Sequence, residues 1–177
     1  DRIDTLRCVL VLFEGVATGA ADGYARMLDR PAATLLHLGP GLANGLSNLH
    51  NAMRAYSPIV NIIGDHATWH RHLDAPLTSD IESAARPFSH WVRTTPNANR
   101  VAEDGAAAIA AALTPPGRVA SLILPGDAAW DEVTAPSVPG SVARLPAVAP
   151  RKRPPQQAID AATEMLLSGR RTVIILA

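Results

Sequence analysis

A glutamate stands where a short apolar run passes into an alanine-rich stretch, in the segment Phe13-Glu14-Gly15. Residues 8–12 predict a buried strand, and residues 14–27 predict a helix. Because ligands of parallel α/β folds bind at the carboxyl ends of strands, Glu14 is a candidate acid or base. The start of the helix favours its ionised form, whereas burial favours its protonated form. A helix cap without chemistry is the alternative interpretation of Glu14.

A histidine precedes a Gly-Pro-Gly turn in the segment His37-Leu38-Gly39-Pro40-Gly41. Residues 33–37 predict a second strand that ends on His37, and residues 42–56 predict the helix that follows the turn. An imidazole in this place can donate to a substrate carboxylate or relay a proton. A histidine that serves only packing is the alternative.

Three more histidines lie close together in the sequence, at His66, His70 and His72. The spacing of His66 and His70 brings both rings to one face only in a helix, and a zinc site needs a third ligand. We therefore interpret the segment as a solvated loop and predict no metal site.

Two more apolar runs, residues 59–63 and 119–124, complete a set of short strands whose hydrophobicity is continuous rather than alternating. Such strands are buried on both faces of a sheet. Residues 101–113 contain a long alanine run and predict another helix. The alternation of strands and helices predicts an α/β fold with a doubly wound parallel sheet and right-handed crossovers.

The helix predicted over residues 14–27 has few bulky side chains and carries glycine at positions 15, 19 and 23. Each glycine costs a helix about 1 kcal/mol relative to alanine. We therefore expect another backbone or a ligand to approach this helix closely. Tight packing of the helix on the sheet is the simpler alternative, and both can hold.

The composition excludes several classes of function. The 177 residues contain 16 basic and 16 acidic side chains, so the formal net charge is zero, and we expect neither nucleic acid nor an anionic membrane as a partner. The single cysteine, Cys8, cannot form an internal disulfide, which indicates a reducing compartment. No apolar run reaches the roughly 18 residues that span a bilayer, and the first residues lack the apolar core of a signal peptide. We therefore expect a soluble, cytoplasmic protein.

Prolines crowd residues 131–155, which have neither helical nor strand periodicity and predict a linker. After them, residues 156–167 predict an amphipathic helix and residues 172–176 predict a strand. A central strand without a neighbour does not end a sheet, so we expect the chain to be a fragment of a longer polypeptide. The expected organisation is a first domain over 1–130, then the linker, then the start of a second α/β domain over 156–177.

The segment from Glu14 to Arg26 resembles the glutamate-containing helix of thiamine diphosphate-dependent enzymes of the acetolactate synthase and 2-oxo acid decarboxylase family. The resemblance continues in the same order along the chain. It includes a Gly-Pro-Gly-x-x-Asn turn from Gly39 to Asn44, a strand that ends in glycine over 58–65, the Arg-Pro segment at Arg86-Pro87, and a closing strand over 116–127. It covers residues 1–130 as the pyrimidine-binding domain of that family and residues 156–177 as the opening of its central domain.

The resemblance implies a fragment of an acetolactate synthase-like enzyme that decarboxylates a 2-oxo acid and then joins two carbon units. It implies that Glu14 bonds to the aminopyrimidine ring of thiamine diphosphate and that Glu14 and His37 are catalytic. The cofactor-binding residues that it implies are Glu14, Gly39, Pro40, Gly41 and Asn44. Mg²⁺ and the diphosphate would be bound mainly by a domain absent from this chain, and FAD on the central domain stays open. The active sites would be shared between subunits of a homodimer or homotetramer.

Departures from the family pattern leave alternatives open. His90 stands where many synthases have lysine, and Asp65 stands where glutamine is usual. These differences imply that the substrate side differs from that of the best-known branch of the family. A 2-oxo acid decarboxylase of the benzoylformate type and a non-catalytic homologue that kept the fold are the alternatives. A nucleotide-binding Rossmann domain is disfavoured, because no Gly-x-Gly-x-x-Gly follows the first predicted strand. We expect the helix, strand and Gly-x-Pro-Gly loop with which the family begins, and its diphosphate-binding domain, to lie outside this chain.

Overall fold

The computed structural model of the chain describes residues 6–134 and 144–175. Its centre is a sheet of four parallel strands in the order β1-β2-β4-β3. The strands are β1 (Ala32–Leu36), β2 (Ile59–Asp65), β3 (Trp91–Thr94) and β4 (Val119–Pro125). The non-sequential order means that the chain crosses over between strands, as it does in doubly wound folds.

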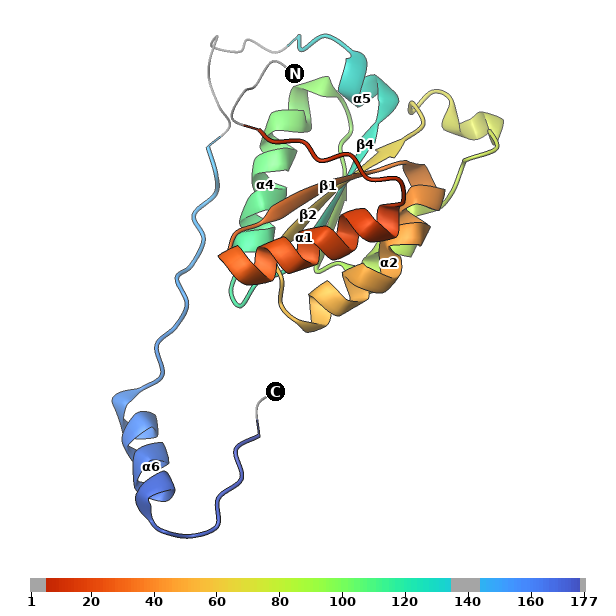
Figure 1. Cartoon of the computed structure of the whole chain (residues 1–177). Helices are drawn as coiled ribbons and strands as arrows, with labels where there is room; N and C mark the ends of the chain where they lie inside the picture. Colours follow the sequence, from red (N-terminus) through yellow and green to blue (C-terminus); the bar gives the residue numbers. More distant parts are fainter. Residues whose placement is uncertain (1–5, 135–143, 176–177) are drawn as a thin grey trace.

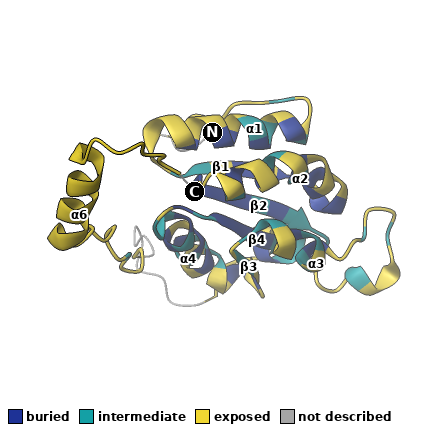
Figure 2. Ribbon diagram, turned by 90° about the horizontal axis from the view of Figure 1, so that it is seen from below, coloured by how far each residue is buried: buried dark blue, intermediate teal, exposed yellow. Residues whose placement is uncertain are grey.

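Helices cover both faces of this sheet (Figure 1 and Figure 2). Helices α1, α2 and α3 contribute to the core on one face, and α4 contributes to the core on the other. The helices are α1 (Glu14–Leu28), α2 (Leu38–Arg54), α3 (Ile81–Ala85), α4 (Val101–Leu113), α5 (Gly126–Trp130) and α6 (Gln156–Leu167), with 3-10 turns at Arg71–Leu73, Arg86–Phe88 and Ala98–Arg100. The prediction of an α/β fold with a doubly wound parallel sheet is thus confirmed.

Two apolar cores fill the space between the sheet and its helices. The larger one lies under α1, α2 and α3 and includes the fully buried side chains of Leu36, Leu42, Leu49 and Ile63. The smaller one lies under α4, whose alanines pack against β2 and β4. Strands β2 and β4 are buried over most of their length, which is why their sequences are continuous apolar runs.

Two predicted strands do not form. Residues 8–12 and 172–175 have no regular secondary structure and are mostly exposed, and residue 176 lies outside the described residues. A strand needs a hydrogen-bonded neighbour, and none of the four described strands pairs with either run. The apolar side chains of Leu10 and Val173 therefore remain in contact with solvent.

One strand and part of one helix are absent from the prediction. Strand β3 has only four residues, none of them fully buried, so no aliphatic run marks it in the sequence. Helix α2 begins at Leu38 rather than at Leu42, and the Gly-Pro-Gly segment is therefore its first turn. Proline is tolerated there, because the first N–H groups of a helix have no partner within the helix.

The residues after the sheet follow the sequence prediction in part. Helix α6 forms over the predicted residues 156–167, and all of its side chains are exposed. Figure 1 shows it away from the sheet, beyond residues 144–155, which contain no helix or strand. In that stretch the guanidinium of Arg151 lies 2.8 Å from the carboxylate of Asp29. No described helix is both long enough and apolar enough to cross a membrane.

Helices α1 and α2 pack closely because small residues line their contact. A Cβ on Gly45 would stand 2.8 Å from Cγ2 of Thr18, and a Cβ on Gly15 would stand 3.2 Å from the carbonyl oxygen of Asn44. The hydroxyl of Thr18 donates to the carbonyl oxygen of Gly45 at 3.1 Å. The close approach predicted for the glycine-rich helix therefore occurs, although Gly23 has no neighbour within 4 Å.

We expect Gly45→Ala to be less stable than Gly23→Ala by about 1–3 kcal/mol. Both substitutions replace a helical glycine by alanine, so each variant gains about 1 kcal/mol of helix propensity. Only the methyl group at position 45 meets a neighbour, the β-branched side chain of Thr18. Denaturant unfolding of both variants measures the difference. The double variant Gly45→Ala with Thr18→Ser should recover most of it, and equal stability of the two single variants would refute this account of the helix contact.

Candidate active site

The carboxylate of Glu14 lies against helix α2. Its Oε2 accepts a hydrogen bond from Asn44 Nδ2 at 3.1 Å, and its Oε1 lies 3.1 Å from the point where a Cβ on Gly41 would stand. Phe13 before it is extended, with φ −152° and ψ 132°, so α1 begins at Glu14 as the sequence predicts. The contacts with α2 hold this carboxylate in one place at the start of α1.

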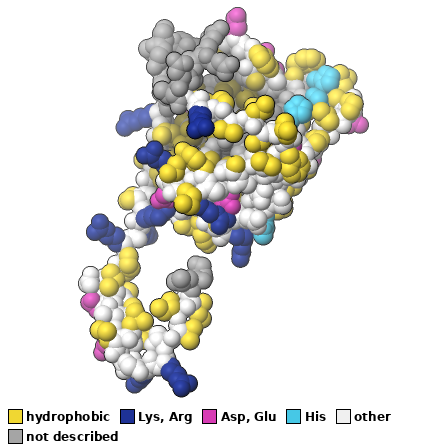
Figure 3. Space-filling model, viewed as in Figure 1, with side chains coloured by type: hydrophobic (Ala, Val, Ile, Leu, Met, Phe, Trp, Pro, Cys, Tyr) yellow, Lys and Arg dark blue, Asp and Glu magenta, His cyan; other side chains and the backbone are white. Residues whose placement is uncertain are grey.

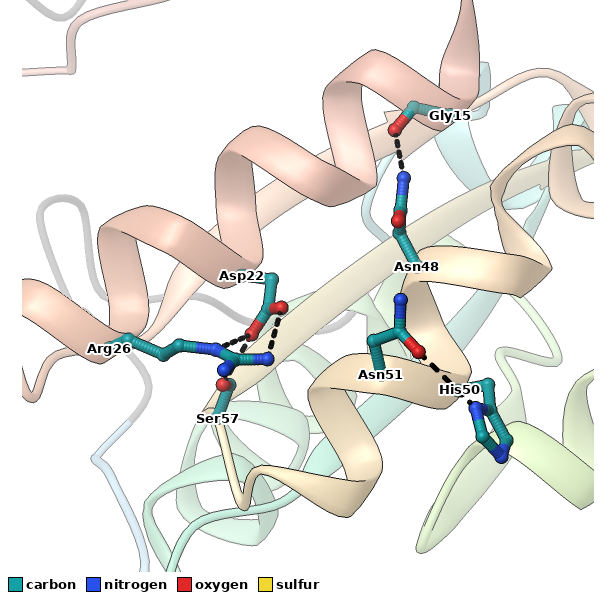
Figure 4. Close-up of polar contacts among 7 residues, drawn as sticks. All are labelled: Gly15, Asp22, Arg26, Asn48, His50, Asn51 and Ser57. Atoms are coloured by element: carbon teal, nitrogen blue, oxygen red, sulfur yellow. Dashed lines mark hydrogen bonds and ion pairs between the residues drawn. The ribbon is translucent and has the colours of Figure 1, made fainter.

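Two asparagines one turn apart on α2 face the first turn of α1. Asn44 donates to Glu14, and Asn48 Nδ2 donates to the carbonyl oxygen of Gly15 at 2.7 Å (Figure 4). Residues four apart share one face of a helix, so the pair joins the two helices at the position of Glu14. The sequence analysis identified Asn44 but missed Asn48, whose spacing from Asn44 was the available signal.

A second polar contact holds α1 farther along its length. Asp22 accepts hydrogen bonds from Ser57 Oγ at 2.5 Å and from Arg26 Nε at 2.8 Å (Figure 4). Burial alone would raise the pKa of Asp22, but these hydrogen bonds lower it. The carboxylate therefore ties α1 to the segment between α2 and β2, which fixes the position of the helix that carries Glu14. The sequence analysis did not identify this contact.

The first turn of α2 contains a backbone conformation that residues with a side chain rarely adopt. His37 is the N-cap residue, and Leu38 follows it with φ +57°, in the left-handed region, although it is buried. A non-glycine residue in this region is strained, and strain of this kind is common at functional sites. The backbone N–H of Gly41 donates to the carbonyl oxygen of His37 at 2.9 Å and closes the turn.

His37 is exposed and lies beside Gly41, on the side where Glu14 lies. Its Cβ is 3.4 Å from the point where a Cβ on Gly41 would stand. Gly39 faces a different neighbour, because a Cβ on it would meet the side chain of Ser79. The structure thus brings together four of the residues predicted for the site, namely Glu14, His37, Gly41 and Asn44, with Gly39 and the exposed Pro40 in the same turn.

The pKa of Glu14 is lowered from its ordinary value near 4.5. The hydrogen bond from Asn44 is the largest cause, followed by a hydrogen bond from the backbone of Glu14 itself and by the charge of His37. Of the two opposing effects considered for this residue, stabilisation of the ionised form is the stronger. Glu14 is therefore a carboxylate that accepts hydrogen bonds at neutral pH.

We expect Asn44→Ala to raise the pKa of Glu14 towards its ordinary value, because the strongest hydrogen bond to the carboxylate is lost. A titration of the Glu14 side-chain carboxyl carbon by NMR measures this change. Asn48→Ala is the matched control, since its amide contacts the backbone of Gly15 and not the carboxylate. An unchanged pKa in Asn44→Ala would contradict the assignment.

The two departures from the family pattern lie at opposite ends of the sheet. Asp65 ends β2, at the edge that carries the Glu14 site, and its carboxylate lies 2.6 Å from a guanidinium nitrogen of Arg71. His90 pairs with Val119 at the beginning of β4, which is the far edge. Burial lowers its pKa, and the nearby charge of Arg118 lowers it further. The parallel register thus places His90 at the amino ends of the strands, away from the Glu14 site.

The three neighbouring histidines lie in the segment after β2. Their region is a turn followed by the 3-10 turn Arg71–Leu73, and the ring centroids of His66 and His70 are 5.3 Å apart. Figure 3 shows histidine side chains gathered on this part of the surface. Among the described residues, no group of three or more His, Cys, Asp or Glu side chains is arranged to hold a metal ion.

Comparison with known proteins identifies the family. Residues 2–86 match the model of the thiamine pyrophosphate enzyme, N-terminal TPP binding domain. The chain is 55% identical over 148 residues to the "Putative acetolactate synthase large subunit IlvX" of Mycobacterium tuberculosis, covering 82% of this chain and 28% of that protein. It is 32% identical over 128 residues to benzoylformate decarboxylase of Pseudomonas aeruginosa, covering 72% of this chain and 24% of that protein.

A solved structure has the same fold. The X-ray structure of a "putative thiamin diphosphate-dependent enzyme" from Mycobacterium smegmatis matches with a TM-score of 0.80 and 26% identity, over 94% of this chain and 31% of that chain. The chain thus spans less than a third of the length of each of these relatives. The matched residues include Glu14, His37 and Asn44, together with the Gly-Pro-Gly turn between His37 and Asn44. The chain belongs to the family of thiamine pyrophosphate enzymes.

Proposed function

We propose that this chain provides the pyrimidine-binding side of a thiamine diphosphate site in an acetolactate synthase-like enzyme that acts on 2-oxo acids. The observation that carries the proposal is the position of the Glu14 carboxylate, which Asn44 holds at the start of α1. In this proposal residues 1–130 form the pyrimidine-binding domain, residues 131–155 are a linker, and residues 156–177 begin a central domain.

The residues around Glu14 fit a flat heteroaromatic ring. A Cβ on Gly41 would stand 3.1 Å from Oε1 of Glu14, so glycine at this position leaves the carboxylate accessible from that side. Gly39, Pro40 and Gly41 present little side-chain bulk in the strained first turn of α2. We therefore assign the binding of the pyrimidine ring to Glu14, Asn44 and this turn.

Thiamine diphosphate supplies the carbanion chemistry of decarboxylation when it is bound. Glu14 would face a ring nitrogen of the pyrimidine and share one proton with it. Because the carboxylate is ionised before the ring binds, that proton would be taken up from solvent on binding. Asn44 orients this carboxylate and keeps its pKa low. His37, exposed beside the same turn, donates to the substrate carboxylate or relays a proton.

The relatives favour acetolactate synthase chemistry over simple decarboxylation. The relative named for acetolactate synthase is 55% identical, and the one named benzoylformate decarboxylase is 32% identical. The benzoylformate type remains the second candidate, because the chain is also similar to a relative of that name. The two candidates differ in what receives the activated carbon unit, a second 2-oxo acid or a proton.

We assign Mg²⁺ and the diphosphate to protein outside residues 1–177, on the same polypeptide or on a partner. In this proposal the enzyme is a cytoplasmic homodimer or homotetramer with shared active sites, and FAD would belong to the central domain. The 177-residue chain alone should then give no saturable heat when titrated with thiamine diphosphate and Mg²⁺. Binding at micromolar concentration by the chain alone would show that these groups are assigned to the wrong place.

The activity is tested in the assembled enzyme, which includes the diphosphate-binding half. The assembled enzyme is supplied with thiamine diphosphate, Mg²⁺ and ¹³C-labelled pyruvate, and released CO₂ and the carbon products are measured by NMR. We expect CO₂ release coupled to formation of a new carbon–carbon bond. Release of free aldehyde with benzoylformate as the better substrate would select the decarboxylase. Tight cofactor binding without turnover of any 2-oxo acid would select a non-catalytic homologue.

A further inference from the structure

A cavity of about 180 Å³ opens at the carboxyl ends of the strands. Asp65 at the end of β2, Thr94 at the end of β3 and Ile123 in β4 line it, and the other lining residues come from the segment between Arg71 and Glu82. In open parallel sheets this edge is where ligands bind. A cavity of this volume has room for a small ligand.

The cavity lies beside the Glu14 site but not within it. Ser79, which also lines the cavity, occupies the space that a Cβ on Gly39 would fill. Glu14 and His37 lie against Gly41, two residues farther along the same turn. The turn therefore separates the cavity from the candidate active site, and neither Glu14 nor His37 lines the cavity.

Two hydrogen-bond donors at the cavity have no partner among the described residues. Nε of Arg71 and Oγ1 of Thr78 are both closed off from solvent without a hydrogen bond. Leaving a buried donor unpaired is costly, and such groups in folded proteins usually serve a water, an ion or a ligand. Arg71 also carries a positive charge, which favours a carboxylate as the missing acceptor.

The cavity also presents one carboxylate that forms no ion pair with a described residue. Asp65 is paired with Arg71, and Glu82 is paired with Arg86 and contacted by the hydroxyl of Thr94. Asp80 instead accepts hydrogen bonds from Ser83, with Oδ1 taking its backbone N–H at 3.0 Å, and forms no ion pair with a described residue. Hydrogen bonds from Ser83 keep its pKa low, so Asp80 is a carboxylate without a paired cation at neutral pH.

We propose that this cavity binds a small α-amino acid, whose carboxylate meets Arg71 and Thr78 and whose ammonium group meets Asp80. A simple anion would face the carboxylates of Asp65, Asp80 and Glu82, which outnumber the cations lining the cavity. A simple cation would leave the donors of Arg71 and Thr78 unpaired. A ligand that carries both charges on neighbouring atoms satisfies both sets of groups. The proposal does not rest on the proposed activity, because it involves none of the residues that would bind thiamine diphosphate.

Binding of L-alanine to the full chain, measured by equilibrium dialysis without thiamine diphosphate, tests the proposal. Propionate and ethylammonium are the matched probes, since each carries one of the two charges of alanine on a similar carbon frame. We expect saturable binding of alanine with a dissociation constant of about 0.1–10 mM, and binding of each matched probe at least about tenfold weaker. A rise in the midpoint of thermal unfolding with alanine provides a second measurement.

Three substitutions locate the site. Arg71→Lys keeps the charge beside Asp65 but removes the Nε donor, Asp80→Asn keeps a side chain that can cap α3 but removes the charge, and Thr78→Val removes only the hydroxyl. We expect the first two to weaken alanine binding about tenfold and the third about fivefold. The controls Arg54→Lys and Asp131→Asn make the same changes at exposed positions that do not line the cavity and should bind alanine normally.

Each other outcome overturns the proposal. Propionate binding as tightly as alanine would identify a plain carboxylate site. Absence of saturable alanine binding up to about 10 mM would exclude the site at any useful affinity. Alanine binding that survives all three substitutions would place it elsewhere on the chain. The variant Glu14→Gln separates this proposal from the activity, since it should bind alanine as the parent does even where it has lost turnover.

Discussion

Replacing Glu14 by glutamine should lower turnover of the assembled enzyme by about 10²- to 10⁴-fold, the range for loss of a positioned acid or base. Glutamine has nearly the same volume and still contacts Asn44, but it cannot accept a shared proton from the pyrimidine ring. The measurement is the steady-state rate of CO₂ release at saturating cofactor. The midpoint of unfolding should change little, because Glu14 is only half-buried.

Glu103→Gln is the matched control for this result. Glu103 also lies in the first turn of a helix, α4, but its carboxylate pairs with Arg100, away from the candidate site. The Glu103→Gln enzyme should release CO₂ at the rate of the parent enzyme. A Glu14→Gln enzyme within about threefold of the parent rate would reduce Glu14 to a helix-capping residue and remove the main support for the proposed function.

Replacing His37 by alanine should slow the decarboxylation step by about 10- to 1,000-fold in a single-turnover experiment, with little change in cofactor affinity. We expect this effect because the His37 side chain is exposed at the N-cap of α2, beside Gly41 on the side where Glu14 lies. In the proposed mechanism it contacts the substrate and not the pyrimidine ring. Because it is exposed, its loss should change the free energy of unfolding by no more than about 0.5 kcal/mol.

His72→Ala is the control for this experiment, since His72 is also exposed but lies in the segment after β2. Its single-turnover rate should equal that of the parent. A His37→Ala enzyme with an unchanged chemical rate and a lowered unfolding midpoint would assign His37 to packing. That pair of measurements decides between the two interpretations that the sequence left open.

Much of the fold could be predicted because its signals are local. The apolar runs at 59–63 and 119–124 mark strands that are buried on both faces, and the alanine run at 101–113 marks a helix whose bounds agree with the structure. Residues 8–12 have the same kind of sequence as these strands, yet they remain unpaired. Strand formation depends on a neighbour in space, which a local pattern cannot supply.

The sequence by itself indicated the family to which this protein belongs. The order of Glu14, His37 and Asn44 around a Gly-Pro-Gly segment indicated the thiamine diphosphate family, and the family comparison agrees. Those residues lie within about 30 positions of one another on two consecutive helices, whose approach was already indicated by glycines in α1. The resemblance supplied the family, and these residues come together because neighbouring elements of an α/β fold pack side by side.

Only the tertiary structure decided which residues distant in sequence lie next to one another. It paired Asn61, which stands inside an aliphatic run, with Thr34 and Ser121 in neighbouring strands, so that a buried amide is satisfied. It placed His90 at the far edge of the sheet and brought Arg71, Thr78 and Asp80 to one cavity beside the Gly39 turn. These outcomes depend on strand register and on the course of the segment after β2. Both are set by packing between residues distant in sequence, and no local pattern of residue types encodes them.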